Sequence, residues 1–200
     1  MTVTFKRLGK KPFFVVSDEE GEHIGLIDFE GKAKLALHDG CEANAEELCA
    51  EIEESEKRIA RSHSLFLLSR RDYSSAELFE KLRELPVNAT AAQFAVEWLC
   101  ELGYINDCDF ARRVASHYAK GGYGPMRLKN ELRRRGFGDE ATDAAMFAAE
   151  ETSDFVTSAR ALAEKKYGSL EDLTYEEKAK VSAFLARRGF TYEQIRSALG

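Results

Sequence analysis

Basic side chains in the middle of the chain are the residues best suited to chemistry with an anion. Residues 109–137 contain only two acids, Asp109 and Glu131, beside a run of arginines and lysines. A guanidinium binds carboxylate or phosphate well, because its planar donors match two oxygens at once. We predict a stripe that binds a partner or DNA, and a second patch near the end of the chain: Arg112, Arg113, Arg127, Lys129, Arg133, Arg134 and Arg135, then Arg187 and Arg188. The alternative is a solvated helix face, which is what most charge runs are.

The sequence contains no known catalytic or cofactor-binding motif. Gly25 and Gly31-Lys32 come near to a phosphate loop, but the spacing is one residue too long. No Ser or Thr follows at the position that would hold magnesium, so we expect a turn there. The cysteines, Cys41, Cys49, Cys100 and Cys108, lack zinc-ligand spacing, and we expect them to be small packed side chains. The sequence therefore predicts a protein that is not an enzyme and needs no metal or cofactor.

The charge is distributed unevenly along the chain. The net charge is -6, yet residues 59–138 carry 13 basic and 9 acidic side chains between two acidic ends. An acidic chain is a poor general coat for nucleic acid, although a local basic stripe can still meet phosphate or an acidic protein surface. We find no secretion signal and no apolar run near 18 residues, and we expect a cytoplasmic monomer with reduced thiols.

The basic motifs belong to internal repeats. Arg134-Arg135-Gly136-Phe137 recurs 53 residues later as residues 187–190. A weaker third copy lies upstream, where Tyr73, Leu78 and Leu82 precede Tyr123, Leu128 and Leu132 by 50 residues. Repeats of this length are typical of stacked supersecondary units, which usually present an extended surface to another macromolecule.

The remaining pattern predicts how these motifs are positioned. From residue 44 onward, capping residues and apolar spacing predict about nine helices in three groups. Start signals lie at Asn44, Ser74, Thr90, Thr174 and Thr191, and apolar stripes include Phe66, Phe94 and Trp98. On the helix from Pro125, Leu128 and Leu132 mark the buried edge, opposite the basic side chains.

Three β-prone runs come before the helices: Val3–Leu8, Pro12–Ser17 and His23–Ile27. The segment 28–38 is ambiguous, because Gly31 interrupts an expected helix. We predict a mainly α protein, a tandem array of three three-helix repeats that is elongated and curved, with a small β-rich N-terminal module. The expected boundaries are 1–43 for the module and 44–106, 107–151 and 152–200 for the repeats.

A helix-turn-helix DNA reader is one interpretation of the Arg-Arg-Gly-Phe turns. In that motif the helix after the turn enters the major groove. Here the helix after Phe137 begins with Asp139 and Glu140, and Asp143 follows, so phosphate would repel it. The positive charge lies on the helix before the turn, which argues against reading of base sequence.

These motifs together resemble the RecX family, regulators of the bacterial RecA recombinase. The resemblance covers about residues 44–200. It rests on residues 67–74 (LLSRRDYS), 102–107 (LGYIND), Gly124-Pro125, Arg135-Gly136 and 184–190 (FLARRGF). One departure is Leu85-Pro86-Val87, where relatives usually have a basic residue and a glycine.

The resemblance implies a noncatalytic partner of the RecA filament on single-stranded DNA. Such a protein would limit filament growth, ATP hydrolysis and strand exchange, and so modulate recombinational DNA repair and the SOS response. The basic stripe would then meet acidic recombinase surface, filament DNA, or both. A general nucleic-acid-binding helical module that acts through the same stripe remains the alternative.

Overall fold

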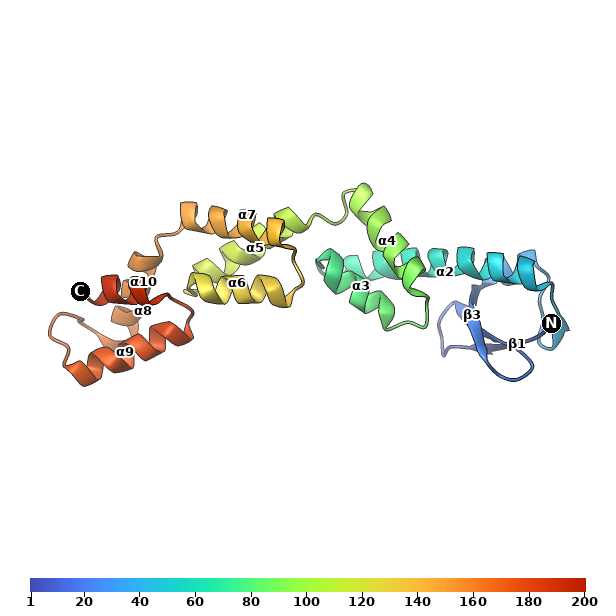
Figure 1. Cartoon of the computed structure of the whole chain (residues 1–200), viewed down its shortest axis with the longest axis horizontal. Coiled ribbons are helices and arrows are strands. Elements are labelled where there is room, and N and C mark those ends of the chain that lie inside the picture. The colour runs from blue at the N-terminus through green and yellow to red at the C-terminus, as the bar shows by residue number, and fades with distance from the viewer. The chain divides into compact units, whose positions relative to one another are not determined.

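The structure is a computed structural model that describes residues 1–200. The chain divides into two compact units, Met1–Ile105 and Asn106–Gly200, and each has its own core. The elements are ten helices and one four-stranded sheet, so the protein is mainly α-helical with a small N-terminal β module, as predicted (Figure 1). No helix combines the length and the hydropathy needed to cross a bilayer.

The N-terminal sheet is antiparallel, with strand order β3-β2-β1-β4. Its strands are β1 (Thr2–Arg7), β2 (Phe13–Ser17), β3 (His23–Asp28) and β4 (Cys41–Glu42). The first three were predicted from their β-prone residues, whereas β4 is too short to leave a pattern. The ambiguous segment contains a short helix, α1 (Phe29–Lys34), which the Asp28 side chain caps at the Gly31 amide.

The first three-helix repeat follows as α2 (Ala45–Leu68), α3 (Ser75–Arg83) and α4 (Ala89–Glu101). The sheet packs along the N-terminal half of α2, and α3 and α4 pack along its other half (Figure 1). Phe13 and Leu26 of the sheet join the same apolar core as Leu78, Leu82 and Leu99 of the repeat. Part of the sheet therefore shares a core with the first repeat, while a separate cluster that includes Val3, Val16 and Leu48 packs the rest of the sheet against α2.

A buried ion-pair network also joins the sheet to α2. The Arg58 guanidinium donates to the Asp28 carboxylate at 2.7 Å and to Glu51 at 2.7 Å. Burial would raise the pKa of Asp28, but the donors from Arg58 and Gly31 outweigh it and hold that pKa below its ordinary value. Glu56 accepts from the amides of Leu26 and Asn88, both at 3.0 Å. Each of these carboxylates therefore has hydrogen-bond donors, and none is buried without a partner.

The second unit holds two further three-helix repeats. The second repeat consists of α5 (Asp107–Lys120), α6 (Pro125–Arg134) and α7 (Asp139–Thr152). The third consists of α8 (Phe155–Tyr167), α9 (Tyr175–Arg187) and α10 (Tyr192–Leu199). One cluster of buried apolar side chains runs through both, from Ala111 to Ala198. The predicted capping boxes at Thr174 and Thr191 are confirmed, as is the one at Ser74 in the first unit.

The predicted start of α4 was wrong. Thr90 is not its cap, because the Asn88 side chain accepts from the Ala91 amide at 2.7 Å and starts the helix earlier. Asparagine caps a helix at least as well as threonine does. Asn88 comes before Thr90 in the chain, so it caps the helix first.

The apolar stripes of the first repeat were only partly correct. Phe66 is 53% exposed and Phe94 is 37% exposed, although both were expected to face the core. Basic side chains cover their rings instead: the Arg70 guanidinium lies 5.3 Å from the Phe66 ring centre, and that of Arg61 lies 5.5 Å from Phe94. Trp98 is half-buried and packs against the core, in line with its expected role.

The cysteines do not form one class. Cys41 is buried in the sheet core, as expected for a small apolar side chain, whereas Cys49 and Cys100 are exposed and Cys108 is half-buried. The expectation of packing was therefore wrong for the exposed pair. Both lie on helices whose buried face is already filled by neighbours such as Leu48 and Leu99, so the cysteine turns outward.

Candidate functional site

The predicted basic stripe centres on α6. This helix begins at Pro125, a residue suited to the first helical position because it lacks an N–H. Leu128 and Leu132 are fully buried, as predicted, and they fix which side of the helix faces the core. The basic side chains then lie on the outer side: Arg127, Arg133 and Arg134 are exposed, and Lys129 and Arg135 are half-buried.

One buried carboxylate binds two arginines at the end of α6. Glu131 is 5% exposed; it accepts from Arg134 Nη2 at 2.7 Å and from Arg135 Nε at 2.9 Å. The hydrogen bond from Arg134 is the main reason that the pKa of Glu131 falls to about 2, and the Arg135 bond adds to it. The pair of arginines is thereby held in place, and about one of their two positive charges is balanced.

The Phe110 ring supports the neighbouring arginines. The guanidinium of Arg113 lies 5.5 Å from the ring centre and that of Arg135 lies 5.8 Å from it, at cation–π distance. The ring itself packs edge-on against Phe137, which is buried. Arg112, one residue before Arg113, pairs with Asp109 at 2.9 Å. Arg112 and Arg113, the part of the stripe on α5, therefore already make contacts within the repeat.

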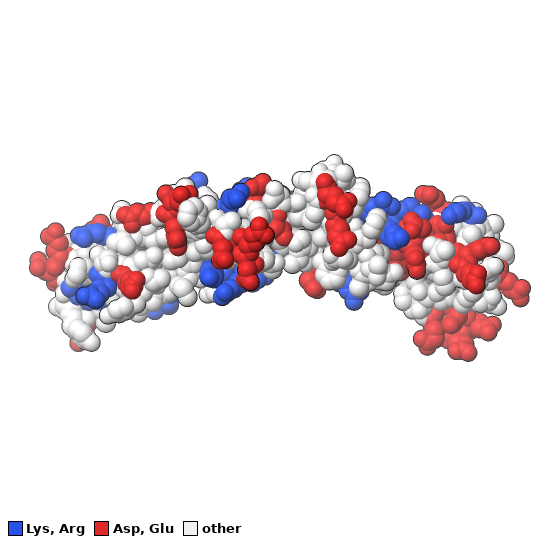
Figure 2. Space-filling view, turned by 45° about the horizontal axis from the view of Figure 1, so that its top comes forward, with Lys and Arg blue, Asp and Glu red and all other residues white.

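Many lysines and arginines of the second unit have no ion pair, and several of the predicted contact residues are among them. Lys129 and Arg133 on α6, and Arg187 at the end of α9, form no salt bridge with any carboxylate. Arg127 has only a long contact with the Tyr123 ring, at 6.0 Å. In Figure 2 a group of basic side chains lies along the lower edge of the second repeat, with acidic side chains above it. These unpaired cations can pair with an anionic partner without breaking an ion pair of the fold.

The two arginines of the second predicted patch lie in different environments. Arg187 is exposed, whereas Arg188 is half-buried and lies over the Tyr123 ring at 4.8 Å. Tyr123 belongs to the second repeat, so Arg188 contacts the neighbouring repeat directly. The structure brings Arg188 together with the start of α6, and it leaves Arg187 on the surface.

Sequence reasoning missed the backbone clasp at this joint, which is made by residues 124–126 and 188–190. The Gly124 amide donates to the Arg188 carbonyl at 2.9 Å, and the Met126 amide donates to the Gly189 carbonyl at 3.0 Å. These two bonds satisfy orphan donors at the start of α6, which has no side-chain cap. The clasp therefore holds the second repeat to the third through the backbone.

Both glycines of the clasp are required by space. A Cβ on Gly124 would lie 2.4 Å from backbone atoms of Gly189, and one on Gly189 would lie 2.5 Å from Arg127. Gly189 also has φ +89, in the left-handed region that favours glycine. A glycine in each of two repeat motifs was visible in the sequence, but only the fold shows that the two meet.

No catalytic constellation accompanies these residues. The surface has shallow hollows but no convergent set of nucleophile, base and acid. No group of three potential metal ligands forms either. The outer face of α6 can bind an anion or an acidic surface, and nothing beside it offers a chemical step.

Comparison with known proteins gives consistent matches. Residues 106–146 match the family model described as "RecX, second three-helix domain", and residues 153–199 match "RecX, third three-helix domain". The "Regulatory protein RecX" of Xanthomonas axonopodis pv. citri (strain 306) is 37% identical over 135 residues, which is 68% of this chain and 82% of that protein. The protein of the same name from Stenotrophomonas maltophilia (strain R551-3) has the same identity and coverage.

Solved structures share the fold. A structure described as "Crystal structure of regulatory protein RecX" superposes with a TM-score of 0.66 at 18% identity, and covers 98% of this chain and 97% of its own. The RecX structure from Lactobacillus salivarius gives a TM-score of 0.60 at 23% identity, and covers 73% and 96%. Because the sequence relatives exceed 30% identity over most of their length, the chain belongs to the RecX family, a family of regulatory proteins and not of enzymes.

Proposed function

We propose that this protein binds the RecA recombinase filament on single-stranded DNA and inhibits its growth, its ATPase activity and strand exchange. It would thereby modulate recombinational DNA repair and the SOS response in the cytoplasm. The observation that carries the proposal is the family membership, with 37% identity to proteins named regulatory protein RecX. The division into a module at 1–43 and repeats at 44–106, 107–151 and 152–200 is part of the same proposal.

The outer face of α6 is the proposed contact. Lys129 and Arg133 have no ion pair, and Arg127 on the same helix is exposed. Arg134 and Arg135 are oriented by Glu131, with Arg112 and Arg113 on the adjacent helix. A filament of recombinase on DNA offers both carboxylates and phosphates, and this face suits either. Arg187 extends the proposed contact, while the role proposed for Arg188 is to support it from the joint.

The direct test is recombinase ATPase on single-stranded DNA, titrated with this protein. Inhibition well below one molecule per recombinase subunit would support capping or disassembly of filaments. A need for nearly equimolar protein would favour occupancy along the filament. ATPase unchanged at a molar excess would refute the proposed function.

General nucleic-acid binding is the second candidate, because the unpaired cations of α6 would suit bare DNA too. Binding to bare single-stranded DNA and to the filament, each over a salt series, separates the two. For single-stranded DNA, the logarithm of the binding constant falls against the logarithm of the salt concentration with a slope of about 0.7 per phosphate contact. Three phosphate contacts would therefore give a slope of roughly two. Bare DNA that binds as tightly as the filament would favour the second candidate.

A further inference from the structure

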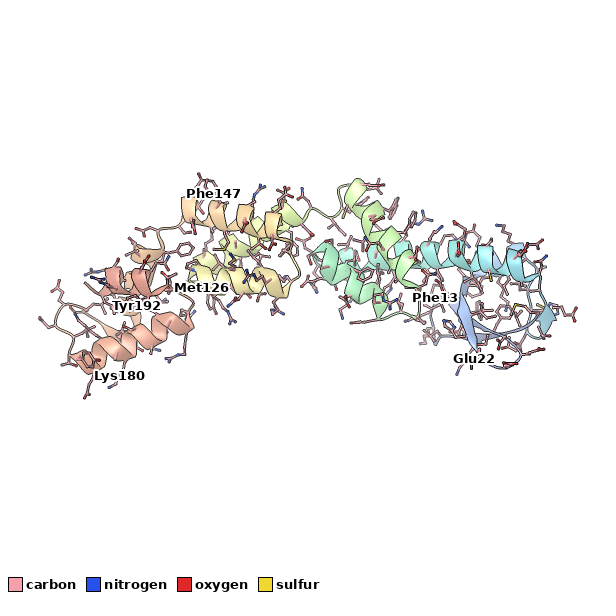
Figure 3. The ribbon with its side chains drawn as sticks, viewed as in Figure 1. Phe13, Glu22, Met126, Phe147, Lys180 and Tyr192 are labelled. Carbon is pink, nitrogen blue, oxygen red and sulfur yellow. The ribbon has the colours of Figure 1, made fainter.

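The third repeat has a hollow that the proposed function does not use. It lies between α9 and α10 and has a volume of about 490 Å³. Figure 3 labels Lys180 on α9 and Tyr192 on α10, the two helices that border it. The lining is drawn from one side of each helix: Lys178, Ser182, Ala183 and Ala186 from α9, Tyr192, Ile195, Arg196 and Leu199 from α10, with Phe190 and Gly200 beside them.

The chemistry of the hollow differs between its floor and its edges. Phe190 and Ile195 form an apolar floor and are 4% and 7% exposed. Ala183 and Ala186 are exposed on α9, and such small side chains allow another backbone to approach closely. Lys178 and Arg196 are the charged side chains of the lining, which contains no Asp or Glu. A ligand that fits must be apolar in the centre and negative at its borders.

The same positions in the second repeat carry different side chains. With the offset of 53 residues, Ala183 and Ala186 replace Asn130 and Arg133 of α6. On the following helix Tyr192 and Arg196 replace Asp139 and Asp143, and Ile195 replaces Thr142. The hollow is therefore not a by-product of the repeat fold, because the side chains at these five positions of the second repeat are polar or charged.

Tyr192 provides an anchor at the open end. It is 79% exposed at the first position of α10, although burial of a tyrosine ring is normally favourable. Tyrosine is among the residues that contribute most to protein interfaces, since it offers a large apolar area and a hydroxyl. An exposed ring beside an apolar groove with cationic edges is the arrangement that receives an amphipathic helix.

We propose that the groove between α9 and α10 binds an amphipathic helix of a partner protein, with carboxylates beside its apolar side chains. The apolar side chains, about one turn apart, would lie on Phe190 and Ile195. The carboxylates would pair with Lys178 and Arg196, and Tyr192 would close over the end. This surface is separate from the proposed contact on α6, and the proposal stands whether or not that partner is the recombinase.

The test uses two synthetic helical peptides with the same leucine stripe, one flanked by glutamates and the other by lysines. Binding is followed by fluorescence anisotropy and by amide shifts of the isotope-labelled protein. We expect the acidic peptide to bind about tenfold more tightly than the basic one, because only its charges complement the edges. We also expect the shifted amides to cluster on residues 178–200. Equal affinity for the two peptides would overturn the proposal.

Matched variants on one helix locate the binding. Ala186→Arg fills the groove, whereas Ala179→Arg places the same side chain on α9 outside the lining. Both alanines are exposed, so both variants should keep the helical circular dichroism of the parent. We expect Ala186→Arg and Tyr192→Ser to weaken the acidic peptide about tenfold, and Ala179→Arg to change its affinity less than about twofold.

Two results would contradict the assignment. If Ala186→Arg binds the acidic peptide as the parent does, the groove is not the site. If the labelled protein instead shows shifts at 178–200 that grow with its own concentration and vanish in Ala186→Arg, the occupant is a second copy of this chain. Because none of these measurements contains recombinase, they fail or succeed separately from the ATPase test.

Discussion

The second and third repeats share a buried scaffold and differ on the surface that covers it. Leu128, Leu132 and Phe137 of the second repeat correspond, 53 residues later, to Val181, Leu185 and Phe190, and all six are buried. The positions between them that do not face the core have diverged, from Lys129 and Arg133 on α6 to Ser182 and Ala186 on α9. Because packing restricts only the inward positions, one fold can present a basic face in one repeat and an apolar groove in the next.

A difference at one position gives the arginines of the repeated motif different partners in the two repeats. Glu131 in the second repeat corresponds to Phe184 in the third. Glu131 holds Arg135 by a hydrogen bond of 2.9 Å, whereas the equivalent Arg188 lies over the Phe184 ring at 5.7 Å and over Tyr123 at 4.8 Å. The same arginine thus completes a charged cluster in one repeat and a joint in the other.

The shared scaffold predicts equal damage from equivalent core changes. Leu132 and Leu185 are both fully buried, so Leu132→Ala and Leu185→Ala should each lower the free energy of unfolding by about 2–5 kcal/mol. Urea denaturation followed by circular dichroism measures both. A cost below about 1 kcal/mol for only one of the two would show that the repeats do not share a scaffold.

The clasp between the repeats predicts a nearly equal cost without any loss of apolar burial. Gly189→Ala should lower the free energy of unfolding by about 2–4 kcal/mol, because it combines left-handed strain with a clash against Arg127. Gly103→Ala is the control: its φ is +74, but nothing lies within 4 Å of the added Cβ. If the two variants lose the same stability, strain alone explains both and the clasp contributes nothing.

Acid should affect the two repeats differently at positions 131 and 184. The pKa of Glu131 falls to about 2 in the folded protein, below its ordinary 4.5, because Arg134 and Arg135 bind the charged form. A lowered folded-state pKa means that this stability is present above pH 4.5 and is lost as the pH falls toward 2.

Removing that carboxylate tests the effect. Glu131→Gln should cost about 1–3 kcal/mol at neutral pH, because both arginines lose a buried charged acceptor. It should also flatten the fall in stability between pH 4.5 and 2, as measured by urea denaturation at each pH. Phe184→Leu, at the equivalent position, should leave the acid dependence unchanged. An unaltered acid dependence in Glu131→Gln would contradict the assignment.

The smallest expected difference lies in the helix caps. The Thr191 side chain caps α10 in a capping box, whereas Gly138 at the start of α7 offers no side chain. Thr191→Ala should cost about 1 kcal/mol, and Gly138→Ser should add a few tenths of a kcal/mol. Thermal unfolding of the two variants measures both changes, and a stabilised Thr191→Ala would show that the box is not formed in solution.

The sequence predicted the elements better than the contacts between them. Periodicity and caps located α2 to α10, because helix signals are local and each is contained within a few residues. The strand β4, with two residues, depends on pairing with β1, which no local pattern reveals. The start of α4 at Ala89 had a local signal in Asn88, but Thr90 competed with it as the expected cap. Phe66 fits an apolar stripe by spacing, yet its exposure depends on how wide a face the neighbouring helices cover.

The candidate site, like the fold, could be predicted only in part from the sequence. The basic character of α6 was visible as composition, and Leu128 and Leu132 set its direction. The sequence did not show that Arg187 and Arg188 differ in their contacts. The two are adjacent in one motif, yet Arg187 faces solvent and Arg188 contacts the neighbouring repeat. The groove on the third repeat was equally hidden, since its floor and edges come from two helices.

The measurement that tests the account most directly exchanges the outward residues of the second repeat for those of the third. In the double variant Lys129→Ser, Arg133→Ala, the outer face of α6 takes the side chains found at the same positions of α9. Neither side chain forms an ion pair, so the fold should keep its stability. The account predicts that this variant, titrated into recombinase ATPase on single-stranded DNA, needs at least about tenfold more protein for half inhibition. Inhibition equal to that of the parent would contradict the proposal that the basic face of α6 makes the contact.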